Sequence, residues 1–144
     1  MKLEEIFELW EKDSVIDRTD LGNESLEISK LHFKYYKIFV YEKIRLKKYE
    51  SDMKVLRLDK YDFYVNGHND ETLKKGWVQP AIGRILKNDV QMYLDADPDI
   101  IRLNLKIGIQ DEKISLLESI IRTIFDRKFV IKNTIEYEKF KMGA

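Results

Sequence analysis

Basic side chains on one predicted helix are the residues of this sequence whose types and spacing most clearly indicate chemistry. One row on this helix contains Lys43, Lys47, Lys54 and Arg57. An offset row nearer the helix start contains Lys30, Lys34, Lys37 and Lys48. Tyrosines are interleaved with them, at Tyr36, Tyr41, Tyr61 and Tyr64.

Such a mixture of basic and aromatic side chains neutralises phosphates and stacks on bases, as in proteins that hold single-stranded nucleic acid. A solvated helix face with tyrosines in the core or at its rim fits the same pattern, so this alternative stays open. Since no element resembles a base-specific motif, binding would be largely independent of sequence.

Signatures of catalysis and metal binding are scarce. The sequence has no glycine-rich phosphate loop, no nucleophile elbow and no histidine pair at metal spacing. Its two histidines, His32 and His68, are each expected to be structural or solvent-facing. One acidic stretch that could hold a divalent cation contains Asp95, Asp97 and Asp99. Helix capping is favoured there, with Asp97 as the N-cap and Pro98 as the first helical residue. We therefore expect no enzyme activity, no cofactor and no metal site.

The charge of the chain is balanced overall and segregated along its length. The 144 residues carry 26 basic and 26 acidic side chains. Residues 1–27 contain three bases and nine acids, whereas residues 28–60 contain ten bases and four acids. This asymmetry indicates a nucleic-acid or acidic partner. The absence of cysteine fits a reducing compartment, and neither a signal peptide nor a membrane span is indicated, so a cytoplasmic protein without membrane association is expected.

The spacing of apolar residues predicts a mostly helical chain, since only two prolines and six glycines occur. A short amphipathic helix is expected over residues 3–10, followed by a connector over 13–22. Residues 23–65 contain no proline or glycine and predict one helix of roughly 40 residues, about 60 Å long. Glu42 and Lys60 interrupt its apolar stripe. A turn or loop is expected from Asn66 to Gly76.

The second half of the chain predicts a short helix beginning near Pro80 and then a heptad-patterned helix. The heptad positions are Leu103, Ile107, Ile114, Leu117, Ile121 and Ile124, with Gln110 as the one polar member. A second stripe beside them contains Leu105, Ile109, Leu116 and Ile120. One face could pack within the subunit and the other between subunits. After residues 129–131, Asn133 or Thr134 could cap a last short helix.

These patterns predict an all-α fold, an elongated helical subunit with a long basic central helix and a C-terminal oligomerisation helix. Residues 1–100 are interpreted as an N-terminal and central DNA-binding region, and residues 101–144 as an oligomerisation region. The expected nucleic-acid-binding residues are Lys43, Lys47, Lys54, Arg57, Lys60, Tyr61 and Tyr64. The expected interface between subunits consists of Leu103, Ile107, Ile114, Leu117, Ile121 and Ile124.

The order of these features resembles the UvsY family, the recombination mediators of T-even-type phages. The family's connector pattern corresponds to residues 13–21, and its long basic helix ends here in residues 61–64. Its acidic break resembles residues 94–99, and its C-terminal piece resembles residues 129–132. No one of these matches is specific, but their order and spacing together are.

The resemblance implies a noncatalytic protein of DNA recombination, repair and replication, located in the host cytoplasm. It would bind single-stranded DNA as a ring-like homo-oligomer and help a RecA-type recombinase replace the single-strand-binding protein. Family members carry a basic, small, basic, leucine sequence implicated in DNA binding. The corresponding window here is residues 58–61. Lys60 matches a basic position of the family pattern, whereas Leu58, beside Arg57, stands at its first basic position.

Two other functions fit the sequence. The first alternative is a coiled-coil structural or scaffold protein without a DNA-binding role, in which the lysine rows only solvate a helix. The second is a helical adaptor whose acidic N-terminal segment binds a protein partner. A salt-dependent single-strand binding assay separates the first from a DNA-binding protein, and truncation of residues 1–20 tests the second.

Overall fold

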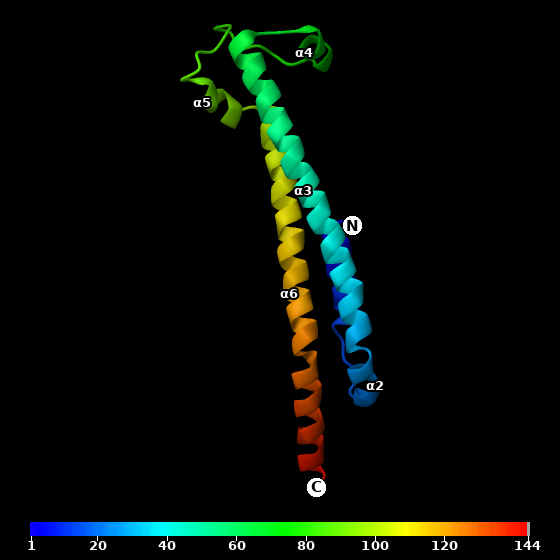
Figure 1. Cartoon of the computed structure of the whole chain (residues 1–144). Coiled ribbons are helices and arrows are strands. Elements are labelled where there is room, and N and C mark those ends of the chain that lie inside the picture. The colour runs from blue at the N-terminus through cyan, green and yellow to red at the C-terminus, as the bar shows by residue number, and fades with distance from the viewer. Residues whose placement is uncertain (144) are drawn as a thin grey trace. The chain divides into compact units, whose positions relative to one another are not determined.

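The computed structural model describes residues 1–143 and is all-α, with six helices and no strand among those residues (Figure 1). Two helices are long, α3 (Ile28–Asn66) and α6 (Pro98–Lys141). The others are short: α1 (Leu3–Asp13), α2 (Leu21–Leu26), α4 (Asp70–Lys75) and α5 (Val90–Asp95). The predicted all-α fold and the long central helix are confirmed.

Contacts divide the chain into two compact units. Unit 1 contains Met1–Arg45 and the residues from Ile109 onward, and unit 2 contains Leu46–Gly108. Both long helices contribute a segment to each unit. These units describe packing, whereas the division of roles between residues 1–100 and 101–144 stays a prediction.

Unit 1 has a core of apolar side chains from three helices. Ile6 of α1, Tyr35 of α3, and Leu117 and Ile124 of α6 are all fully buried in it. Trp10 packs edge-on against Tyr35, with ring centroids 5.4 Å apart. The amphipathic N-terminal helix that the sequence predicts therefore covers α3 and α6 within this unit.

Unit 2 is built around the end of α3 and the beginning of α6, and Figure 1 shows α4 and α5 beside the end of α3. Its buried core consists of Phe63, Tyr64, Ile85, Val90, Leu94 and Ile100. Asp97 caps α6 as predicted, because its Oδ1 accepts hydrogen bonds from the backbone N–H groups of Asp99 (2.9 Å) and Ile100 (3.1 Å). Gly67 follows α3 with φ of +88°, a conformation that favours glycine.

Several predicted helix boundaries were wrong. Pro80 does not begin a helix: residues 77–89 form turns and loops, and α5 starts only at Val90. The loop expected over 66–76 contains α4, whose N-cap Asn69 accepts a hydrogen bond from the backbone of Thr72 at 2.9 Å. The C-terminal pieces form one helix, since α6 continues through 129–134, and Thr134 donates to the carbonyl of Val130 instead of capping a new helix.

Candidate nucleic-acid interface

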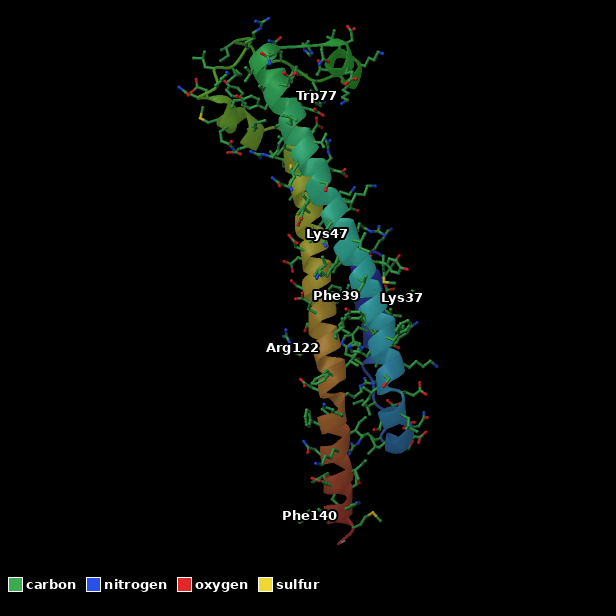
Figure 2. The ribbon with its side chains drawn as sticks, in the orientation of Figure 1. Lys37, Phe39, Lys47, Trp77, Arg122 and Phe140 are labelled. Atoms are coloured by element: carbon green, nitrogen blue, oxygen red, sulfur yellow. The ribbon has the colours of Figure 1, made fainter. Side chains whose placement is uncertain are left out.

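Three of the predicted DNA-contacting lysines lie exposed on α3. Lys47 and Lys54 belong to unit 2, and Lys43 precedes them in unit 1. No carboxylate among residues 1–143 lies within ion-pairing distance of these three ammonium groups. Figure 2 labels Lys47 on this helix. These lysines are therefore free to neutralise phosphates.

Arg57 and Tyr61 follow Lys54 on the part of α3 that belongs to unit 2. Both are half-buried, and Arg57 donates a long hydrogen bond of 3.5 Å to Gln91. Tyr61 packs against the core of unit 2. A phosphate could compete for the Arg57 guanidinium, but Tyr61 offers only part of its ring to a base.

Lys60 lies inside unit 2, with its side chain 4% exposed. Its Nζ is 2.8 Å from the carboxylate of Asp99 and 3.1 Å from that of Asp97. It also lies 3.8 Å from the ring centroid of Trp77. The hydrogen bond from Lys60 lowers the pKa of Asp99. This ammonium is thus occupied by internal partners of unit 2, and the predicted contact of Lys60 with DNA stays a prediction.

Tyr64 is also buried, so it is not a platform for base stacking in this structure. Its hydroxyl donates a 2.6 Å hydrogen bond to Asp97. Burial, and then this hydrogen bond to a carboxylate, raise the pKa of the Tyr64 hydroxyl. Tyr64 therefore holds the same buried carboxylate as Lys60.

Glu42, the polar residue that interrupts the apolar stripe of α3 in unit 1, also has a partner within the chain. Glu42 is 2% exposed, and its carboxylate accepts a 2.6 Å hydrogen bond from the amide of Gln110, the one polar heptad position of α6. The same amide donates to the Glu42 carbonyl at 2.8 Å. Burial raises the pKa of Glu42, but the Gln110 hydrogen bond and nearby cations lower it more, so the carboxyl titrates below its usual range.

Comparison with known proteins gives a family for this arrangement. The sequence pattern described as "Recombination, repair and ssDNA binding protein UvsY" matches residues 9–144. The chain belongs to the UvsY family. None of the curated proteins compared with the chain matches it.

Solved structures show the same fold. The chain is similar to crystal structures of the bacteriophage T4 recombination mediator protein UvsY. For lattice type IV the TM-score is 0.81 at 23% identity, covering 97% of this chain and 99% of that one. For lattice type II the TM-score is 0.79 at 24% identity, covering 99% and 98%.

The residues predicted to form the interface between subunits of this UvsY-family member are buried or half-buried within the single chain. Leu117 and Ile124 are fully buried in the core of unit 1, where they meet α1 and α3. Their part in an interface between subunits stays a prediction. Ile121 is half-buried and packs against the same cluster. The remaining positions, Leu103, Ile107 and Ile114, are half-buried. A second subunit could reach Leu117 or Ile124 only if this core opened.

An aromatic and basic segment of α6 in unit 1 was not predicted from the sequence. Phe125 and Phe129 are 58% and 54% exposed, and the Nζ of Lys128 lies 4.2 Å from the ring centroid of Phe125. The signal was present as two phenylalanines four residues apart with basic residues between them, a spacing that places both rings on one helix face.

Other classes of site find no support in the part of the chain that the structure describes. Across residues 1–143 no group of three or more His, Asp or Glu side chains is placed to hold a metal ion. No described helix combines the length and the apolarity needed to cross a membrane.

Proposed function

We propose that this UvsY-family protein binds single-stranded DNA through the exposed lysines of α3. The observation that carries the proposal is that the side chains of Lys43, Lys47 and Lys54 are exposed and have no carboxylate partner among residues 1–143. The chain also belongs to a family whose description includes binding of single-stranded DNA. Arg57 follows Lys54 on α3 in unit 2. Such contacts recognise phosphates and discriminate little between bases.

The protein would act as a homo-oligomer, with residues 101–144 supplying contacts between subunits. Exposed apolar side chains of α6 in unit 1 support this, among them Val130 and Phe140. Because apolar surface of this kind commonly marks interfaces, it is a better candidate than the buried heptad positions. Several subunits on one strand would add weak contacts at high effective concentration.

The biological role that we propose is that of a recombination mediator, which helps a RecA-type recombinase to replace single-strand-binding protein on DNA. The name of the T4 relatives supports this role. We expect no catalytic step in it, since the protein would act by binding alone.

A loading assay tests this role. Single-stranded DNA is first covered with single-strand-binding protein, and the DNA-dependent ATPase activity of a RecA-type recombinase is then followed. We expect the protein to shorten the lag before ATP hydrolysis, and Lys47→Ala with Lys54→Ala to abolish this effect. On bare DNA the protein should change the lag little. An unchanged lag on covered DNA, with binding of DNA intact, would contradict the mediator role.

A further inference from the structure

An open groove of about 370 Å³ lies between α3 and α6 in unit 1. Four aromatic rings line it: His32, Tyr36 and Phe39 from α3, and Phe125 from α6. Figure 2 shows Phe39 on α3 and Arg122, another lining residue, on α6. Aromatic rings are therefore the main lining of this groove.

The rings are accessible and already arranged for stacking. His32 and Tyr36 stack nearly parallel, with centroids 5.7 Å apart and an interplanar angle of 12°. Phe39 follows Tyr36 at 6.1 Å. Tyr36 is 49% exposed and Phe125 is 58% exposed, so neither belongs to the core of unit 1. A flat ligand could stack here without opening the fold.

Cations surround these rings. The Nζ of Lys43 lies 5.2 Å from the Phe39 centroid, and that of Lys128 lies 4.2 Å from the Phe125 centroid. Arg122 lines the groove directly, and Glu118 is the one carboxylate among its lining residues. Lys43 of unit 1 is also one of the lysines proposed above to bind phosphates, so one cation beside the groove is assigned to DNA on other grounds.

We propose that this groove is a base-stacking site, in which unpaired nucleobases of single-stranded DNA lie against Tyr36 and Phe125 while Lys43, Arg122 and Lys128 meet the flanking phosphates. This inference rests on the proposed function and adds to it, since neutralising phosphates requires no contact with bases. Aromatic rings bind bases with little preference among them, because every base has a π-face.

Charge favours DNA over a second copy of the chain as the occupant. Lysines are depleted at the cores of protein interfaces, because burying an ammonium group without a partner is costly. Here Lys43 and Lys128 lie directly over the rings that such an interface would cover. Phosphates flanking a stacked base supply the negative charge that these ammonium groups need.

Two oligonucleotides of equal length test the proposal: oligo-dT, and a strand whose residues are abasic sugar phosphates. We expect the wild type to bind oligo-dT more tightly than the abasic strand. Tyr36→Leu with Phe125→Leu keeps the apolar surface and should reduce this preference by about tenfold, within the range for loss of a stacked ring. The matched control is Phe33→Leu, an exposed phenylalanine on α3 that does not line the groove.

The outcomes separate the two proposals. If neither strand binds, the proposed function fails, and the stacking site fails with it. Equal binding of both strands by the wild type, or a preference that survives in a folded double variant, would overturn the stacking site alone. A double variant that changes the mass of the oligomer and keeps its preference for oligo-dT would instead assign the groove to a second copy of the chain.

Discussion

Replacing Lys60 with methionine is expected to lower the free energy of unfolding of unit 2 by about 3 to 5 kcal/mol. Asp97 is 2% exposed, and removal of the ammonium would leave its charge with only the Tyr64 hydroxyl and two backbone N–H groups as partners. Trp77 contacts Lys60, so its fluorescence follows the unfolding of unit 2. Denaturation in a Trp10→Phe background, in which Trp77 is the remaining tryptophan, therefore measures the change in the free energy of unfolding.

Two controls accompany this variant. Arg102→Met removes an exposed cation from Asp99 and should cost about 0 to 1 kcal/mol, because Arg102 is 76% exposed. Combining Lys60→Met with Asp97→Asn should recover part of the loss, since the unpaired carboxylate is then gone. A Lys60→Met protein as stable as the wild type, yet deficient in DNA binding, would contradict the structural role and return Lys60 to the DNA site.

Truncation of Leu117 to alanine should lower the stability of unit 1 by about 2 to 5 kcal/mol. Leu117 is fully buried between α6, α3 and α1, so the variant would leave a cavity in the core. Denaturation followed by Trp10 fluorescence in a Trp77→Phe background measures this loss, since Trp10 packs on the same cluster.

The control for Leu117 is Ile109→Ala, an apolar residue of the same helix and the same unit that is 54% exposed and should change stability by less than about 0.5 kcal/mol. If Leu117→Ala dissociates the oligomer while the subunit keeps its stability, Leu117 belongs to the interface that the heptad pattern predicted. A core role for Leu117 requires instead that the subunit itself loses stability.

The long helix α3 was predictable because residues 23–65 contain no helix breaker. Its start was predicted too early, since α2 ends at Leu26 and α3 begins at Ile28 after a turn at Glu27. Asp97 was recognisable as a cap from the proline that follows it. Two polar residues that interrupt the apolar stripe of α3, Glu42 and Lys60, were also visible in the sequence, but the residues that they contact were not. Glu42 pairs with Gln110, 68 positions away, and such a pairing depends on how two helices pack, which a single sequence does not reveal.

The candidate site was predictable only in part, because periodicity shows which residues share a helix face and not what covers that face. Lys54 and Lys60 are both basic residues near the end of α3, yet one is exposed and the other is buried beside Asp97. In the same way, the heptad pattern of α6 indicated an apolar seam, but not that the chain's own α1 and α3 cover it at Leu117 and Ile124. The error at Pro80 has a local cause, since proline also suits turns.

The most direct test of the central claim is a titration of a fluorescent single strand with the protein over a series of salt concentrations. We predict that single strands bind more tightly than duplex, and that the logarithm of affinity falls linearly with the logarithm of salt, with a slope of about −0.7 per neutralised phosphate. Lys47→Ala with Lys54→Ala should make the slope shallower by about 0.7 for each lysine removed. Lys139→Ala with Lys141→Ala should leave it unchanged. Affinity that does not respond to salt, or loss of binding only in the Lys139 and Lys141 variant, would contradict a DNA site on α3.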